Sequence, residues 1–344
     1  MKRTARVVAA AGVVGVVTAL AGCAGGAGGA GPSDDTTITL YNGQHESTTK
    51  MLVSAFEKDT GIDVKVRSGE GPELANQIIQ EGSASPADVI YTENSPALTL
   101  LSERGLLAKT DKATLRKIPS KYNSPNGDWV GVAARETVLV YDPRTLTKDE
   151  LPHSILDLAK PRWKGKVGIA PTEGDFHPVV TAVRVLEGKH KAQTWLNNLA
   201  DNAKSYNENE GIIKDVNRGN LAAGVINHYY WFRIRDEMGA DAMHAKLYYF
   251  GHHDPGALLN ISGAGVLKSS DHKKAAQRFL AFLAGKQGQG AIADSDDFEY
   301  TLNPDVQPNP ALKPLDQLDP PKVSVAQLGD GSEALKQMRK AGLL

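Results

Sequence analysis

The side chains in this sequence that are best suited to bind a ligand are a histidine, a glutamate and two adjacent tyrosines. Each lies soon after a β-like stretch. They are His45, Glu93, Tyr229 and Tyr230. A tyrosine phenolate is a hard oxygen donor, but its ordinary pKa of ~10 means that only a strongly acidic cation removes its proton near neutral pH. Ferric iron is such a cation. Two phenolates and one carboxylate balance its charge, and imidazole completes four ligands, which leaves two octahedral positions for water or a small anion.

Each of these residues has a simpler interpretation when it is considered alone. A loop histidine is usually a satisfied polar residue, a glutamate at a helix start suits the helix dipole, and paired tyrosines commonly pack in a core. The occurrence of all four residues soon after predicted strands favours a metal site. By contrast, His252-His253-Asp254 looks like a metal cluster, but the Pro255-Gly256 that follows predicts a turn with exposed histidines.

Composition narrows the chemistry further. The 344 residues include 39 Lys and Arg and 40 Asp and Glu, for a formal net charge of −1. Because there is no basic excess to neutralise phosphates, nucleic acid is not an expected partner. A single cysteine excludes a disulfide framework and any metal site built from several thiolates. We therefore expect a ligand held by oxygen and nitrogen atoms.

The N-terminal residues have the character of an export signal. Basic residues precede an apolar run at 7–20, which is shorter than the ~20 residues that span a bilayer. Cys23 follows Leu-Ala-Gly, a pattern that resembles a bacterial lipoprotein signal with lipid attached to the cysteine sulfur. The alternative is an ordinary signal peptide with an incidental cysteine. We predict a signal peptide at 1–22, a flexible tether at 23–35, and an extracytoplasmic protein anchored to the cell membrane by lipid.

From residue 36 onward, β-like and helical patterns alternate along the chain. Strands are predicted at 36–41, 62–67, 87–91, 167–170, 222–226 and 246–250, and helices at 48–59, 74–81, 98–105, 179–186, 192–199 and 231–238. This succession predicts an α/β fold with mostly parallel sheets flanked by helices. Ligands of such folds bind at the carboxyl ends of strands, which is where the four candidate ligands lie.

Two separate strand–helix runs predict two lobes with a cleft between them. Apolar stretches at 138–141 and 259–266 are interpreted as crossings between the lobes, and 333–340 as a helix. The predicted division is an N-lobe of 36–138 plus 262–310, a C-lobe of 139–261, and a C-terminal segment of 311–344 that packs back on a lobe.

Five stretches, in order along 36–344, resemble the periplasmic ferric-iron-binding proteins, or bacterial transferrins. They are Tyr41-Asn42-Gly43-Gln44-His45, Ala87-Asp88-Val89-Ile90-Tyr91-Thr92-Glu93, Trp163-Lys164-Gly165-Lys166, Asn227-His228-Tyr229-Tyr230-Trp231 and Asp254-Pro255-Gly256-Ala257-Leu258. The resemblance implies a type II periplasmic-binding-protein fold and a monomer that captures Fe(III) and delivers it to an ABC transporter permease without catalysis. It also implies that His45, Glu93, Tyr229 and Tyr230 are the iron ligands.

The same resemblance implies a synergistic anion, commonly phosphate, in the remaining iron positions. The residues expected near it are Asn94, Gly174, Asp175, Asn209 and Asn227, with Arg135 as a counter-charge. This chain departs from the family at 172–175, where Glu173 and Asp175 bring negative charge, although backbone N–H groups at a helix start still bind anions. We therefore hypothesise weak phosphate binding, with water, carbonate or citrate in its place.

Two alternatives stay open at this point. The same fold binds polyamines, thiamine, sulfate or phosphonates in related proteins, but those sites use aromatic boxes or anion-binding amides rather than this donor set. An iron oxygenase requires two histidines and a carboxylate, and a second histidine would have to come from His228 or His252. Neither a nucleophile elbow nor a His-Glu-x-x-His motif is present, so an enzyme is not expected.

Overall fold

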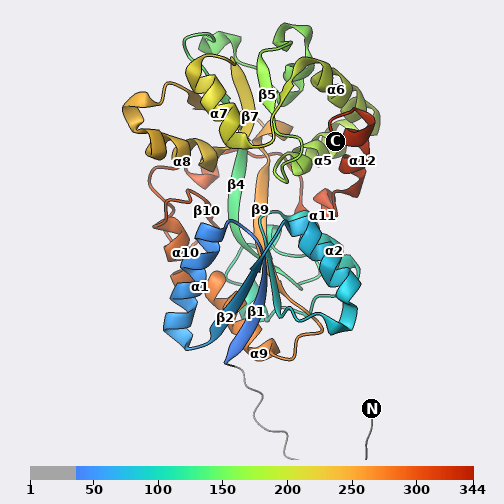
Figure 1. Ribbon diagram of the computed structural model, residues 1–344, viewed down its shortest axis with the longest axis vertical. Helices are drawn as coiled ribbons and strands as arrows, with labels where there is room; N and C mark the ends of the chain where they lie inside the picture. The colour runs from blue at the N-terminus through green and yellow to red at the C-terminus, as the bar shows by residue number, and fades with distance from the viewer. Residues whose placement is uncertain (1–35) are drawn as a thin grey trace, which may run out of the picture. The chain divides into compact units, whose positions relative to one another are not determined.

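Ten strands form a mixed sheet in the computed structural model, which describes residues 36–344 (Figure 1). The strands are β1 (Thr37–Gly43), β2 (Asp63–Ser68), β3 (Val89–Thr92), β4 (Val130–Tyr141), β5 (Val167–Ile169), β6 (Lys204–Ser205), β7 (Ala223–Asn227), β8 (Lys246–Tyr248), β9 (Leu259–Val266) and β10 (Tyr300–Thr301). Their order is β2-β1-β3-β9-β4-β7-β5-β6, with β8 and β10 also paired to β4. The predicted signal peptide, Cys23 and the tether lie outside the described residues. Within 36–344, no helix is long and apolar enough to cross a membrane.

Helices follow the strands as the alternating pattern predicted. They are α1 (Glu46–Thr60), α2 (Gly71–Glu81), α3 (Ser95–Glu103), α4 (Lys112–Leu115), α5 (Phe176–Glu187), α6 (Lys189–Asn202), α7 (Asn209–Arg218), α8 (His228–Met238), α9 (Lys273–Leu283), α10 (Lys286–Ala293), α11 (Val325–Leu328) and α12 (Ser332–Lys340). Short 3₁₀ turns occupy Gly82–Ala84, Ser120–Tyr122, Lys148–Glu150, Ile155–Ala159, Pro161–Trp163, Ala240–Ala242, Pro255–Ala257 and Leu315–Gln317. The helix α1 is followed by Gly61, whose φ of 68° suits a left-handed helix cap.

Strand pairing is more mixed than the strand–helix order predicted. The outer pairs β1–β2, β1–β3, β5–β6 and β5–β7 are parallel, whereas β3–β9, β4–β9 and β4–β7 are antiparallel. The difference arises because β4 and β9 are long strands that connect the two strand–helix runs and return against their neighbours. The crossings predicted at 138–141 and 259–266 lie within these two strands, and β4 begins eight residues earlier, at Val130.

The strand β4 links the two halves of the sheet. Residues 130–136 pair with β9 and residues 137–141 pair with β7, and every side chain of β4 is buried. Figure 1 shows β4 and β9 running together between the two groups of helices. This arrangement brings side chains of the middle of β4 close to the ends of β1, β3 and β7.

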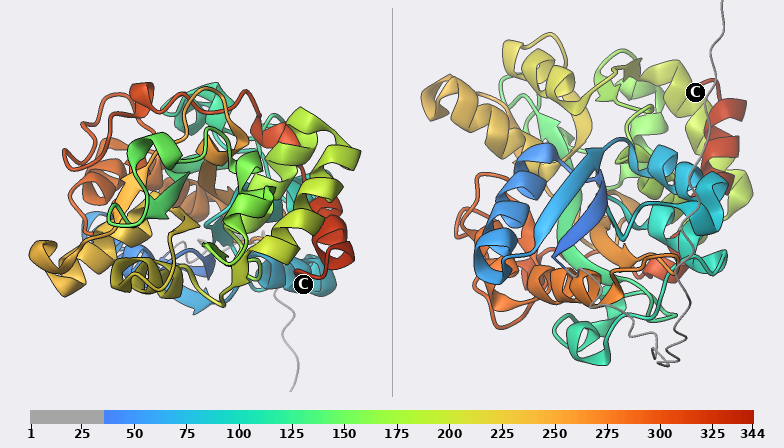
Figure 2. Two further views of the ribbon diagram at one scale, coloured as in Figure 1. Left: turned by 90° about the horizontal axis from the view of Figure 1, so that it is seen from above. Right: turned by 60° about the horizontal axis from the view of Figure 1, so that its bottom comes forward.

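The C-terminal residues pack against helices of both strand–helix runs. The helix α12 lies against α5 and α6, and its buried Met338 joins the apolar core that contains Trp195 and Phe176. The shorter α11 contacts both α3 and α5. Figures 1 and 2 show this red segment beside the green helices. The C-terminal segment therefore spans the border between the two halves rather than covering one of them alone.

Candidate metal-binding site

Two of the candidate ligands emerge at one edge of the sheet because β1 and β3 are parallel neighbours. In their register Gly43 lies opposite Thr92, so the residues that follow each strand leave the sheet side by side. His45 Nε2 and Glu93 Oε1 are 3.4 Å apart. A side chain at Gly43 would not fit here, since a Cβ atom would lie 2.8 Å from the Cα of Gly71. This glycine thus permits the close packing of the turn that leads to His45.

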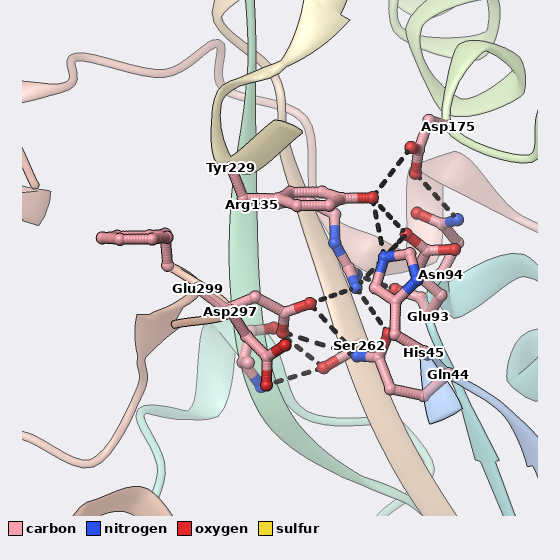
Figure 3. A network of polar contacts seen from close by, with 12 residues as sticks. Gln44, His45, Glu93, Asn94, Arg135, Asp175, Tyr229, Ser262, Asp297 and Glu299 are labelled. Atoms are coloured by element: carbon pink, nitrogen blue, oxygen red, sulfur yellow. Dashed lines mark hydrogen bonds and ion pairs between the residues drawn. The ribbon is translucent and has the colours of Figure 1, made fainter. Parts of the chain in front are cut away.

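The third group comes from the start of α8, directly after β7. The hydroxyl of Tyr229 lies 2.8 Å from Nε2 of His45 and donates to Oε1 of Glu93 at 3.0 Å (Figure 3). Tyr230 packs beside Tyr229, with ring centroids 4.1 Å apart, and its ring centroid is 6.2 Å from that of His45. Both tyrosines are buried. Three distant parts of the chain therefore bring imidazole, carboxylate and phenol groups together.

The electrostatics of the site hold the carboxylate charged and the phenols neutral. Burial opposes ionisation of Glu93, but Arg135 and hydrogen bonds from His45 and Tyr229 outweigh it, so the pKa of Glu93 is lowered. Burial, together with the nearby carboxylates of Asp175 and Glu93, raises the pKa of Tyr229 well above its ordinary value, and the pKa of Tyr230 likewise. Only a strongly acidic cation would displace these phenolic protons at neutral pH.

A buried arginine supports the site from β4. Arg135 is fully buried, donates to Oε1 of Glu299 at 2.7 Å and to Oε1 of Gln44 at 3.2 Å, and also donates to the backbone carbonyl of Glu93. Its Nη2 lies 3.5 Å from Oε1 of Glu93. Sequence reasoning assigned Arg135 as a counter-charge for an anion and missed Gln44 and Glu299. No local signal pointed to Glu299, because it lies far along the chain from the other residues.

Of the residues predicted to contact an anion, Asp175 lies against Tyr229, and it lines a very small cavity together with two of the others. Asp175 Oδ1 accepts from Asn94 Nδ2 at 3.4 Å, and Asp175 Oδ2 accepts from the Tyr229 hydroxyl at 3.5 Å. Asp175, Asn209 and Asn227 line a cavity of only about 10 Å³. The Nδ2 atoms of both asparagines are buried without a hydrogen-bond partner among the described residues. Gly174 lies next to Asn94, with an added Cβ 3.5 Å from Asn94 Nδ2.

The other histidines of interest have structural roles. Nδ1 of His228 accepts from the backbone N–H of Glu136 at 3.1 Å, and its Nε2 donates to the Phe298 carbonyl at 2.8 Å. Burial lowers the pKa of His228 to about 3, so it stays neutral with both nitrogens in use. His252 and His253 lie in an exposed turn, as predicted. Among residues 36–344, no group of three or more His, Cys, Asp or Glu side chains is placed to hold a metal ion.

Two strand–helix runs joined by the long strands β4 and β9, with polar side chains gathered where β1, β3 and β7 end, are consistent with a solute-binding protein. The chain belongs to the family of bacterial extracellular solute-binding proteins, whose family model matches residues 84–317. This membership places the protein outside the cytoplasm.

Three proteins similar to this chain are named for iron or were solved with iron bound. The Fe(3+)-binding periplasmic protein of Serratia marcescens is 46% identical over 312 residues, which cover 91% of this chain and 92% of that protein. Iron-bound HitA from Pseudomonas aeruginosa is 44% identical, with a TM-score of 0.86 over 90% of this chain and 100% of that one. FutA of Trichodesmium, in complex with iron and citrate, is 29% identical, with a TM-score of 0.78 over 90% of this chain and 100% of that one. These relatives are type II periplasmic binding proteins in fold.

Proposed function

We propose that this protein binds one Fe(III) ion through His45, Glu93, Tyr229 and Tyr230 and delivers it to an ABC transporter permease. The observation that carries the proposal is the position of the Tyr229 hydroxyl, within hydrogen-bond distance of both the His45 imidazole and the Glu93 carboxylate. The proposal is supported by the Serratia Fe(3+)-binding protein and iron-bound HitA, which are similar to this chain over most of their length. The role requires binding and release, and no bond of a substrate is broken.

The donor set suits ferric iron better than other common metal ions. Phenolate and carboxylate are hard anionic donors that match Fe(III), whereas Zn²⁺ prefers thiolate and imidazole. Two phenolates and the Glu93 carboxylate would neutralise the ion in a buried setting, where an unbalanced charge is costly. Arg135 lies 2.7 Å from Glu299 and 3.5 Å from Glu93, and its charge keeps the Glu93 carboxylate ionised, the form that would bind the metal. Four protein ligands leave two positions open for exogenous oxygen donors.

Binding is proposed to be coupled to closure of two lobes about β4 and β9. The lobes would be 36–138 plus 262–310 and 139–261, with 311–344 crossing their border. His45 and Glu93 belong to the first lobe and the two tyrosines to the second, so iron would favour the closed arrangement that a permease recognises. We further propose that the protein acts as a monomer, tethered by lipid on Cys23 after removal of residues 1–22.

We propose that the anion in the two open coordination positions of the iron is not a tightly bound phosphate. A cavity of about 10 Å³ beside Asp175, Asn209 and Asn227 admits at most a single water molecule by volume. The Asp175 carboxyl therefore excludes a larger anion from the two asparagine amides. Water, carbonate or citrate would have to bind from the other side of the site.

Visible absorption of the lipid-free protein (residues 36–344) during titration with ferric citrate tests the assignment. We expect a phenolate-to-iron charge-transfer band that saturates at one equivalent and weakens in both Tyr229→Phe and Tyr230→Phe. Tyr248→Phe, on β8, is the matched control and should retain the band. A colourless titration, together with a rise in melting temperature on adding a polyamine, thiamine or an organic anion, would reject iron in favour of another solute.

A further inference from the structure

Positive charge is concentrated on two stretches of the chain, 109–112 and 268–278. Together they carry six lysines and arginines and two carboxylates, a net charge of +4 in a chain whose formal net charge is −1. All six cationic side chains are exposed, and they are called the basic end below: Lys109, Lys112, Lys268, Lys273, Lys274 and Arg278. Like charges held this close repel one another, and an anionic partner would relieve the repulsion.

The two stretches form one continuous surface although more than 150 residues separate them in the chain. The backbone N–H of Asp111 donates to Oε1 of Gln277 at 3.1 Å, and Nε2 of Gln277 donates to the Lys109 carbonyl at 2.9 Å. The backbone N–H of Lys268 donates to the Leu106 carbonyl at 2.8 Å. The short helix α4 also packs against α9. The charges of both stretches therefore act together on whatever faces this surface.

The strand β1 begins beside the basic end. The backbone N–H of Thr39 donates to Oδ2 of Asp88 at 2.8 Å, and Oγ of Ser270 donates to Oδ1 of the same carboxylate at 2.6 Å. Figure 1 shows the start of β1 next to α9. His45 follows the other end of β1. The basic end and the candidate metal-binding site thus lie at opposite ends of this strand.

The proposed lipid anchor would keep the basic end close to a membrane. Thirteen residues, Cys23 to Asp35, precede the first described residue, and an extended chain of that length reaches at most about 45 Å. Since the described part of the chain starts beside the basic end, this surface is the one that the anchor brings nearest to the lipid. Anionic headgroups attract clustered lysines and arginines within about a Debye length of the membrane.

We propose that the basic end binds the anionic phospholipid surface of the cell membrane. This contact orients the anchored protein with its candidate metal-binding site directed away from the lipid, where iron arrives from solution. The inference goes beyond the proposed function and uses from it only the lipid on Cys23, which supplies proximity. The binding surface itself consists of described residues. The other possible occupant is an acidic surface of a protein, and the test below separates the two.

The test measures sedimentation of the protein with lipid vesicles. The chain 23–344 with Cys23→Ser carries no lipid, so any binding comes from the protein surface. Vesicles of phosphatidylcholine alone are compared with vesicles that also contain phosphatidylglycerol, at low salt and in about 0.5 M salt. One variant combines Lys112→Gln, Lys274→Gln and Arg278→Gln, whose side chains make no hydrogen bond or ion pair with residues 36–344. Its matched control combines three exposed positions of the proposed second lobe, Lys164→Gln, Lys189→Gln and Arg218→Gln.

We expect binding to the anionic vesicles at low salt, loss of that binding in high salt, and no binding to phosphatidylcholine alone. The first variant should bind about a hundredfold more weakly, because each cation near an anionic membrane contributes about fivefold. The control variant should bind as the wild type does. Equal weakening in the two variants, equal binding to both kinds of vesicle, or no binding of the wild type at low salt would overturn the inference, and the last result would assign the surface to a protein partner.

Titration with ferric citrate accompanies each vesicle measurement. All variants should retain the phenolate-to-iron band, which shows that they are folded and that the basic end is separate from the iron site. Loss of the band in the first variant alone would overturn this separation. Absence of the band from the wild type would instead reject the proposed function, whatever the vesicles show.

Discussion

Glu136 is a buried carboxyl group that has no hydrogen-bond partner among residues 36–344, and replacing it with glutamine should stabilise the protein increasingly as the pH rises. The residue is fully buried on β4, and neither of its side-chain oxygens has a hydrogen-bond partner among the described residues. Burial raises its pKa to about 9, and the positive charge of Lys313 offsets this only in part. Glu136 is therefore protonated in the folded protein at neutral pH.

The size of the effect follows from proton linkage. In the unfolded chain Glu136 titrates near its ordinary pKa of ~4.3, and each unit of difference between the two states is worth about 1.4 kcal/mol. Because the folded pKa is raised, the contribution of Glu136 to stability is complete below about pH 4 and declines as pH rises toward about 9. At pH 7 the loss amounts to roughly 3.5 kcal/mol on this reasoning. Glutamine cannot ionise, so Glu136→Gln avoids that loss.

Chemical denaturation of wild type and Glu136→Gln at pH 5, 6, 7 and 8 measures this directly. The difference in free energy of unfolding should shift in favour of the variant by about 1.4 kcal/mol per pH unit. Any cost of burying the glutamine amide is the same at every pH and leaves this slope unchanged. Glu103→Gln, at an exposed glutamate of α3, is the control for the removal of a carboxylate. A stability difference that does not vary with pH would refute the reasoning.

Three further predictions concern the site. Burial and nearby carboxylates raise the pKa of Tyr229 and Tyr230, so iron must displace two protons when it binds. Equilibrium titrations should show the iron affinity falling by up to about a hundredfold per pH unit on acidification. An affinity that does not depend on pH would contradict phenolate ligation. Arg135→Met removes the partner of the buried Glu299; denaturation should show a loss of about 3–5 kcal/mol, whereas a loss below about 1 kcal/mol would mean that the pair contributes little. In competition titrations, phosphate should leave the iron affinity of the wild type unchanged but raise the iron affinity of Asp175→Ala. If phosphate raised the iron affinity of the wild type, Asp175 would not exclude the anion.

The sequence by itself determined the alternation of strands and helices and the donor groups that follow the strands. Apolar periodicity specifies elements locally, and Gly61 ends α1 because a left-handed cap favours glycine. His45 and Glu93 could be placed together because the carboxyl ends of parallel neighbouring strands lie at one edge of a sheet. The exposed turn at His252 could likewise be predicted from the Pro-Gly that follows it.

Only the tertiary structure decided the surroundings of those donor groups. The pairing of Arg135 with Glu299 joins positions 164 residues apart, and no local pattern records such a contact. The same holds for His228, whose two ring nitrogens are satisfied by distant backbone groups, and for Asp175, which lies against the Tyr229 hydroxyl. Local sequence specifies which groups a segment offers, but their burial, charge and free space depend on contacts with segments remote in the chain.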